Sequence, residues 1–345
     1  MVTPPSDHAR APLAGDHAAS PPGPAGPASP PPILVGVDWL AGALVEADAE
    51  ADADEDADDD AGVSDRRRRV VVCDLRWYLD GRDGAAAYRA GHLPGARFVD
   101  LDVVCSAPHL SEGGHPTDGR HPLPSPERFA AAVGALGIGD GDIVVAYDDS
   151  GGGTAGRFVW MLRALEAPAM LLDGGLAAWL AAHPGRLDTG DAEPCEPATF
   201  TARPWPADRL AGWDDAERAG DARPGSPVPR PLLLDARAPD RYRGDTEPVD
   251  RRAGHIPGAV NLPWATLVDP DTRRFLPTAE LARVLRAAGI TADTDVVASC
   301  GSGVSACALL VALEHVGHAR ARLFVPSWSG WSSDPDRPAA IGDTP

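Results

Sequence analysis

Cysteine is scarce in this chain, and its pattern excludes two common kinds of cysteine-based structure. Only five are present among 345 residues, an odd and irregularly spaced set. Such a set does not match a disulfide framework and suits a reducing compartment, which predicts a cytoplasmic protein. No pair or cluster of cysteine and histidine has the spacing of a zinc site, so we expect no bound metal. The five are Cys73, Cys105, Cys195, Cys300 and Cys307.

Long apolar runs are also absent. No segment approaches the ~18 consecutive apolar residues that cross a bilayer, and the N-terminus lacks the basic and apolar regions of a secretory signal. The net charge is −20, and residues 46–60 hold ten acidic side chains and no basic one. A surplus of negative charge disfavours binding to nucleic acid or to an acidic membrane surface. We therefore expect neither of these as a partner.

Composition divides the chain into folded and low-complexity parts. The length predicts two domains with additional segments. Residues 1–32 are rich in proline, alanine, glycine and serine, which predicts a disordered tail. Residues 46–69 combine an acidic run with four arginines and predict a solvated insertion in the first domain. Residues 186–205, rich in proline, glutamate and threonine, predict a linker, and residues 339–345 a second tail.

The rest of the chain contains an internal repeat. Each half carries a Gly-His-(Leu/Ile)-Pro-Gly-Ala segment, and since His92 and His255 recur there, we expect a shared structural role for them. Asp148 stands where Cys300 falls in the second half, so the first half should be catalytically silent. The matching segments are residues 37–42 and 207–212, 70–76 and 231–237, 91–96 and 254–259, 143–148 and 295–300, and 172–179 and 324–331.

Short apolar runs alternate with helical patterns in both halves. Runs of this length predict buried strands, whereas residues 129–136 and 281–288 predict helices that end near glycine. Strands that alternate with helices predict a mainly parallel sheet covered on both faces. In such folds ligands bind beyond the carboxyl ends of the strands, where Cys300 lies. The predicted strands are residues 144–146, 170–172, 232–234 and 296–298.

Cys300 has the surroundings of a nucleophile. It ends a β-branched run and is followed by Gly301 and Gly303, after which an apolar helical pattern begins at Ala306. Backbone N–H groups of such a turn, with the positive end of the helix dipole, favour thiolate over thiol. The glycines let the backbone curl around one atom. The pattern predicts a persulfide-forming cysteine, with a buried structural cysteine as the alternative.

Four features together resemble the two-domain rhodanese-type sulfurtransferases. They are the tandem halves, the paired Gly-His segments, the run Leu171–Trp179 and the Cys300 loop. The resemblance covers about residues 33–338. It implies an α/β fold of two tandem rhodanese-like domains, residues 33–185 and 206–338, each a mainly parallel sheet with helices on both faces. It also implies that the second domain carries the active cysteine.

Within this family, the residues after the cysteine separate two donor classes. Thiosulfate sulfurtransferases tend to carry basic residues there, whereas Gly301-Ser302-Gly303 resembles 3-mercaptopyruvate sulfurtransferases. The resemblance implies that sulfur moves from 3-mercaptopyruvate through a Cys300 persulfide to cyanide or to a thiol acceptor such as a thioredoxin-like protein. It implies no cofactor. Thiosulfate as the donor is the main alternative.

The resemblance also implies a relay of side chains beside Cys300. Ser302 belongs to the loop, and Asp102 and His121 of the first half match the other two members of a relay proposed for the family. An ordinary loop histidine is the alternative for His121. The remaining loop residues expected to contact substrate are Gly301, Gly303, Val304 and Ser305.

Arginines are expected to hold the substrate carboxylate, because a guanidinium can donate two parallel hydrogen bonds to it. Arg241 matches a substrate-binding arginine of the family. A second one precedes the Gly-His-Ile-Pro-Gly segment, where Arg251 and Arg252 fit equally. The alternative for these arginines is a surface ion pair with Asp245, Glu247 or Asp250.

Two other function classes use similar features. A phosphatase with a cysteine in such a loop needs an arginine six positions later, where this chain has Ala306. Non-enzymatic interaction modules of this type often lack the cysteine, which is present here. Both alternatives therefore rank below a sulfurtransferase.

Overall fold

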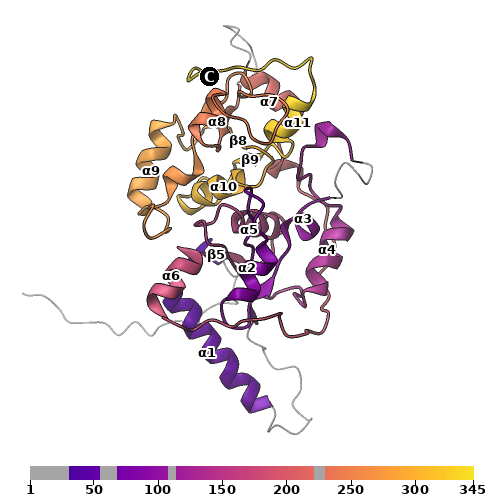
Figure 1. Ribbon diagram of the computed structural model, residues 1–345, viewed down its shortest axis with the longest axis vertical. Helices are drawn as coiled ribbons and strands as arrows, with labels where there is room; N and C mark the ends of the chain where they lie inside the picture. Colours follow the sequence, from indigo (N-terminus) through magenta and orange to yellow (C-terminus); the bar gives the residue numbers. More distant parts are fainter. Residues whose placement is uncertain (1–30, 55–67, 108–113, 221–229) are drawn as a thin grey trace, which may run out of the picture. The chain divides into compact units, whose positions relative to one another are not determined.

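Two parallel β-sheets form the frame of the part of the chain that the structure describes (Figure 1). The computed structural model describes residues 31–54, 68–107, 114–220 and 230–345. In the first half the strands are β1 (Leu34–Val35), β2 (Val70–Asp74), β3 (Arg97–Phe98), β4 (Ile143–Tyr147) and β5 (Ala169–Leu172). In the second they are β6 (Leu232–Asp235), β7 (Val260–Asn261), β8 (Val296–Ser299) and β9 (Arg322–Leu323).

The strand order is β1-β5-β4-β2-β3 in the first sheet and β7-β6-β8-β9 in the second. Every strand pairing within these two sheets is parallel. The four runs that the sequence predicts as strands lie in β4, β5, β6 and β8. The predicted α/β class with parallel sheets is therefore confirmed.

Helices connect the strands in both halves. Those of the first half are α1 (Val37–Asp54), α2 (Gly84–Ala90), α3 (Leu101–Val104), α4 (Pro126–Ala135), α5 (Ala155–Ala164) and α6 (Gly175–Ala182), with the 3-10 turn η2 (Pro116–Asp118). Those of the second are α7 (Trp213–Ala219), α8 (Pro239–Arg243), α9 (Thr278–Ala287), α10 (Ala306–His315) and α11 (Ser327–Ser333), with 3-10 turns η3 (Ala207–Arg209) and η4 (Trp264–Leu267). Helices α4 and α9 confirm the two predicted ones. None of the helices in the described ranges has the length and apolar character needed to traverse a lipid bilayer.

Both faces of each sheet are covered, as the near-continuous apolar strands require. Successive side chains of a strand point to opposite faces, so Val71 and Cys73 of β2 enter one core while Val72 enters another. The core that contains Val71 also contains Val296 and Ala298 of β8, so it runs through both halves without a break. The two outer cores lie against α1, α2 and α6 in the first half and against α7, α8 and α11 in the second.

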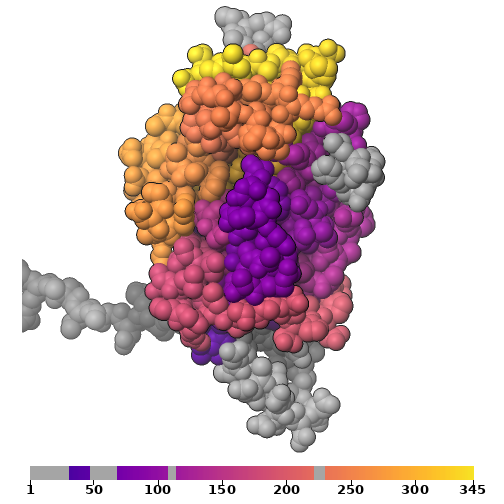
Figure 2. Space-filling view, in the orientation of Figure 1, coloured from indigo at the N-terminus to yellow at the C-terminus, as the bar shows by residue number. Residues whose placement is uncertain are grey.

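The two halves meet along α5 and α10, which lie against each other in the centre of Figure 1. Figure 2 shows the surface of both halves from the same side, with the orange and yellow segments of the second half above the indigo and magenta segments of the first. Gly156 permits the close approach, since a Cβ there would lie 3.1 Å from the backbone N and Cα of Ala308. At the far end of the helices Arg163 forms an ion pair with Glu314 at 2.5 Å.

The repeated motifs make equivalent contacts in the two halves. Nδ1 of His92 lies 2.9 Å from the carbonyl of Tyr88, and Nδ1 of His255 lies 2.8 Å from that of Tyr242. Each imidazole also stacks on the ring of the same tyrosine, with centroids 3.8 and 3.7 Å apart. These buried contacts are those of the shared structural role that the repeat predicts for both histidines.

The predicted connector and tails are less separate from the domains than composition indicates. Residues 46–54 of the acidic segment continue α1, and residues 1–30 and 55–67 lie outside the described residues. The connector pairs with the first half through an antiparallel bridge between His92 and Asp188. Ala340 in the C-terminal segment forms the same bridge with His255. The domain boundaries given above stay a prediction.

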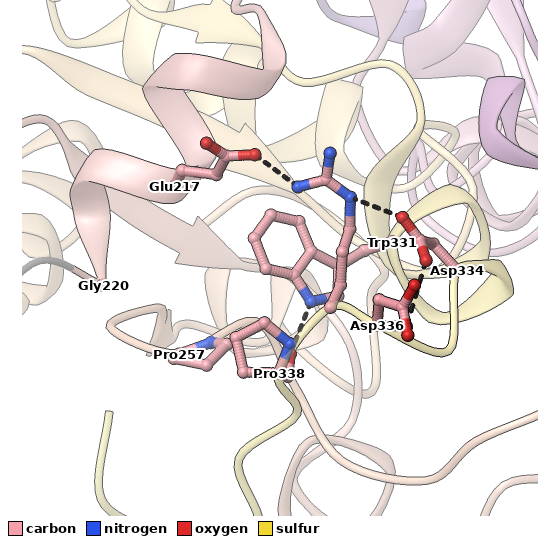
Figure 3. A pocket seen from close by; sticks show the side chains of 8 residues that line it. Glu217, Gly220, Pro257, Trp331, Asp334, Asp336 and Pro338 are labelled. Carbon is pink, nitrogen blue, oxygen red and sulfur yellow. Dashed lines mark hydrogen bonds and ion pairs between the residues drawn. The ribbon is translucent and has the colours of Figure 1, made fainter.

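An arginine between two tryptophans anchors the C-terminal segment. The guanidinium of Arg337 lies 4.1 Å from the ring centroid of Trp213 and 4.9 Å from that of Trp331. It also forms a 2.5 Å ion pair with Glu217. A cavity of about 430 Å³ lies next to these contacts, and Figure 3 shows Glu217, Trp331 and Asp334 around it. The cavity is thus lined by the residues that hold the segment in place.

We predict that Gly156→Val destabilises the protein, because the added side chain separates α5 from α10. Overpacking of this kind costs about 1–3 kcal/mol, measured as the change in the free energy of unfolding in urea. The matched control is Gly42→Val, also in a helix, where a Cβ meets no atom within 4 Å. That variant should unfold within about 0.5 kcal/mol of the parent. Equal stability of the two variants would contradict the close packing of the halves.

Candidate active site

Cys300 lies at the carboxyl end of β8, in the turn that leads into α10. It is buried, and its Sγ accepts a hydrogen bond from the backbone N–H of Gly303 at 3.1 Å. Gly303 has φ of +77°, and a Cβ there would lie 2.8 Å from the carbonyl oxygen of Val325. Only glycine combines this left-handed backbone with so close an approach. The turn predicted from the two glycines is therefore wrapped around the sulfur.

The start of α11 fixes this turn from the other side. The backbone N–H of Trp328 donates to the carbonyl of Cys300 at 3.0 Å, and that of Ser329 donates to Gly301 at 2.8 Å. Oγ of Ser327 accepts from the N–H of Cys300 at 3.2 Å. Ser327 has φ of +51°, an unfavourable region for a serine. Its buried hydrogen bonds offset that strain and hold the cysteine backbone in one position.

The turn after β4 in the first half is equivalent to the Cys300 turn, and it holds a negatively charged group. Asp148 occupies the place of the cysteine, and its carboxylate is buried. It accepts hydrogen bonds from the backbone N–H groups of Ser150, Gly152, Thr154 and Ala155 at 2.8 to 2.9 Å. The N–H groups of this loop type thus surround a negative group. In the second half the atom at the same point of the repeat is the sulfur of Cys300.

Three side chains from both halves form a hydrogen-bonded chain beside the sulfur. Oγ of Ser302 lies 2.7 Å from Nδ1 of His121, and Nε2 of His121 lies 3.0 Å from Oδ1 of Asp102. An ionised carboxylate can only accept, so the proton sits on Nε2 and the lone pair of Nδ1 faces the serine hydroxyl. In this tautomer His121 is ready to accept the proton of Ser302. The structure therefore brings together the side chains that the resemblance groups as a relay.

His121 is buried beside an aromatic ring, a carboxylate and two guanidinium groups. Its ring packs edge-on against Trp77, whose Nε1 donates to Asp102 at 3.0 Å. Burial lowers the pKa of His121 below its usual value, and Arg157 and Arg120 act in the same direction. The hydrogen bond and charge of Asp102 oppose this shift. The imidazole is consequently held neutral near pH 7, as a proton acceptor must be.

The other buried cysteines lack this environment. Burial raises the pKa of both Cys73 and Cys307 to about 12, so these thiols stay protonated. Burial likewise raises the pKa of Cys105. In the described residues, no group of three or more histidine, cysteine, aspartate or glutamate side chains is arranged to hold a metal ion. Cys300 is therefore the candidate for sulfur chemistry.

Two arginines from different halves lie over the Cys300 loop. A Cβ on Gly301 would lie 3.0 Å from Nη2 of Arg120 and 3.4 Å from Nη1 of Arg241. Arg241 is the position expected from the sequence. Arg120 was not expected, although it directly precedes His121 in the chain. That adjacency was the available signal, because a loop that delivers His121 to the site also delivers its neighbour.

The two remaining arginine candidates are separated by the structure. Arg252 donates to the backbone carbonyls of Trp331, Ser332, Asp334 and Arg337, and so it closes the end of α11 instead of facing the loop. These carbonyls take up its guanidinium, and a contact of Arg252 with the substrate stays a prediction. Arg251 is exposed and lines a cavity of about 180 Å³ together with Arg120. Val304 and Ser305 accept the first hydrogen bonds of α10 through their carbonyls.

Comparison with known proteins identifies the family of this chain. A family model described as rhodanese-like domain matches residues 53–182 and 220–334. The chain belongs to the rhodanese-like family. Two of its relatives carry names that state different sulfur donors. The putative thiosulfate sulfurtransferase SseB of Mycobacterium tuberculosis is 42% identical, over 82% of this chain and 94% of the relative. The probable 3-mercaptopyruvate sulfurtransferase of Pseudomonas aeruginosa is 41% identical, over 79% and 93%.

A solved rhodanese-like structure matches both halves together. The crystal structure of SseA from Escherichia coli, described with the rhodanese fold of 3-mercaptopyruvate sulfotransferases, superposes with a TM-score of 0.67. The match covers 86% of this chain and 99% of SseA, at 28% identity. The predicted architecture of two tandem rhodanese-like domains is confirmed.

We predict that Asp102→Asn lowers the pKa of His121 further, because the neutral amide no longer stabilises the imidazolium. The measurement is an NMR titration of the His121 ring in histidine-labelled protein. The matched control is Asp118→Asn in the same loop region, whose carboxylate accepts instead from the backbone of His115. An unchanged or raised pKa in Asp102→Asn would show that the carboxylate does not act on the imidazole.

Proposed function

We propose that this rhodanese-like protein is a sulfurtransferase that takes sulfur from 3-mercaptopyruvate and passes it on through a persulfide on Cys300. The observation that carries the proposal is the contact of Ser302 with His121 directly beside a cysteine whose sulfur accepts a backbone N–H. A hydroxyl at this point suits a donor with a carbonyl oxygen. Relatives named for 3-mercaptopyruvate and the match to SseA support the same donor.

In the first step the thiolate of Cys300 attacks the sulfur of 3-mercaptopyruvate. A sulfur–sulfur bond forms, the carbon–sulfur bond breaks, and its electron pair moves into an enolate of pyruvate. The hydroxyl of Ser302 turns its single proton from Nδ1 of His121 to the enolate oxygen and donates a hydrogen bond there. The enolate carbon then takes up the proton that the substrate thiol carried, which leaves pyruvate and an anionic persulfide.

In the second step an acceptor removes the outer sulfur. A thiolate attacks it and leaves as a new persulfide, while Cys300 regains its electron pair as a thiolate. Cyanide reacts in the same way and leaves as thiocyanate. The backbone N–H groups of the loop stabilise the anionic sulfur in both steps, as their counterparts stabilise the carboxylate of Asp148.

Arg120 and Arg241, the arginine pair, are assigned as the groups that bind the carboxylate of the donor. Arg120 and Arg241 lie over Gly301, so a donor bound there presents its sulfur toward Cys300. Arg251 at the nearby cavity is the third candidate. Guanidinium groups suit a carboxylate because they donate two parallel hydrogen bonds in one plane.

Thiosulfate is the second candidate donor. The relative named for thiosulfate in M. tuberculosis favours it, and two arginines near the loop are compatible with an anion of higher charge. The loop itself favours 3-mercaptopyruvate, because Gly301-Ser302-Gly303 adds no cation next to the sulfur.

For the acceptor we propose a thiol, such as a thioredoxin-like protein, in the cytoplasm. All five cysteines are free, which suits a reducing compartment where thiol acceptors are abundant. The strongly negative charge disfavours nucleic acid and acidic membranes as partners.

We predict that Cys300→Ser lowers sulfur transfer from either donor by at least about a thousandfold, since a serine hydroxyl forms no persulfide. The assay measures thiocyanate formed from cyanide with each donor, and mass spectrometry detects the added sulfur after donor treatment. Cys195→Ser, the same change in the connector, is the matched control and should keep full activity. Sulfur transfer that survives in Cys300→Ser would refute the assignment of Cys300 as the nucleophile. A higher kcat/KM for thiosulfate than for 3-mercaptopyruvate in the parent protein would refute only the assignment of the donor.

A further inference from the structure

A carboxylate already bridges the two arginines assigned to the donor. Oδ1 of Asp250 forms an ion pair with Nη1 of Arg120, and Oδ2 accepts from Nη2 of Arg241 at 3.2 Å. The side chain of Asp250 is only 4% exposed, compared with 22% for Arg120 and 13% for Arg241. The guanidinium groups of the two halves are thus joined by a buried negative group where a donor carboxylate needs them.

The charges around this bridge balance. Glu247 accepts from Arg241 at 2.7 Å and lies 3.4 Å from Arg237. Arg237 in turn forms a 2.7 Å ion pair with Asp235. With Arg120 and Asp250, the cluster consists of three guanidinium groups and three carboxylates, so it carries no net charge when all six are ionised. The arginine pair therefore offers hydrogen-bond donors to an anion but no surplus positive charge.

A small anion can reach this bridge. Arg120 and Asp250 line the cavity of about 180 Å³ that also includes Arg251 and Ser329. The other side of the pair faces Gly301 and the loop. A donor that enters between cavity and loop competes directly with Asp250 for both arginines.

Building on the proposed function, we propose that Asp250 is a specificity-determining residue. Its carboxylate competes with the negative group of the donor for Arg120 and Arg241 and favours monoanionic donors, such as 3-mercaptopyruvate, over dianionic ones, such as thiosulfate.

The preference follows from Coulomb's law. A bound donor at the pair lies close to Asp250, and the repulsion from that single charge is twice as large for a dianion as for a monoanion at the same distance. Removal of the charge should therefore change the logarithm of kcat/KM for thiosulfate by about twice the amount for 3-mercaptopyruvate. A role of Asp250 in folding alone would change both donors by the same factor.

The test is Asp250→Asn, which keeps the shape of the side chain and removes its charge. We expect kcat/KM to rise by about tenfold for 3-mercaptopyruvate and by about a hundredfold for thiosulfate, mainly through KM. Asp250→Glu keeps the charge and should keep the donor ratio of the parent. The matched control is Asp245→Asn, which removes the same charge from an exposed ion pair with Arg243. Its donor ratio should stay within about twofold of the parent because solvent screens that charge.

A second measurement avoids catalysis altogether. In the Cys300→Ser background, calorimetry compares the binding of pyruvate, a monoanion, with that of sulfate, a dianion. Asp250→Asn should strengthen sulfate binding by the larger factor. Equal factors for the two anions, or no change in either, would overturn the role of Asp250. The donor preferred by the parent protein is a separate result, so a failure of the proposed donor is distinguished from a failure of this inference.

Discussion

The buried guanidinium of Arg157 connects the two halves of the site, and the geometry of the relay depends on it. It extends from α5 of the first half and donates to the carbonyl of Gly303 in the Cys300 loop and to that of His121, both at 3.0 Å. It is completely buried. One side chain therefore sets the position of the loop that carries the sulfur relative to the loop that carries the imidazole. The cost of burying its charge is offset by these carbonyls, which a flexible neutral side chain would not hold in place.

This arrangement gives the first half a part in the site, although Asp148 stands there in the place of the cysteine. The first half supplies His121 and Asp102 to the relay and Arg120 to the arginine pair. Its own loop cannot form a persulfide, because the carboxylate of Asp148 occupies the N–H groups that would hold the sulfur. The buried carboxylate also keeps that loop rigid, and α5 with Arg157 begins directly after it. The duplicated loop has thus become a support for the active one.

Much of the fold and half of the site were predictable from the sequence. Strand and helix positions followed from apolar periodicity, and the Cys300 loop from its glycines, because these signals are local in the chain. Arg120 and the bridge through Asp250 were not predictable, because Arg120 and Asp250 are 130 residues apart and meet only after the halves pack. The partners of Arg252 were not predictable for the same reason. Its position before the Gly-His segment fits a substrate role, but the carbonyls at the end of α11 come from residues about 80 positions later.

The positively charged side chains around the site are arginines, and this determines how the site responds to pH. The sequence contains no lysine, so all 31 side chains counted as lysine or arginine are arginines. A guanidinium keeps its charge at any pH in which the protein is folded, and its planar donors pair two acceptors at once. Arg120, Arg157 and Arg241 are therefore fixed charges. Among the side chains of the relay, His121 is the one whose ordinary pKa lies near neutral pH, and burial lowers that pKa, so the imidazole gains its charge only at a more acidic pH than a free histidine does.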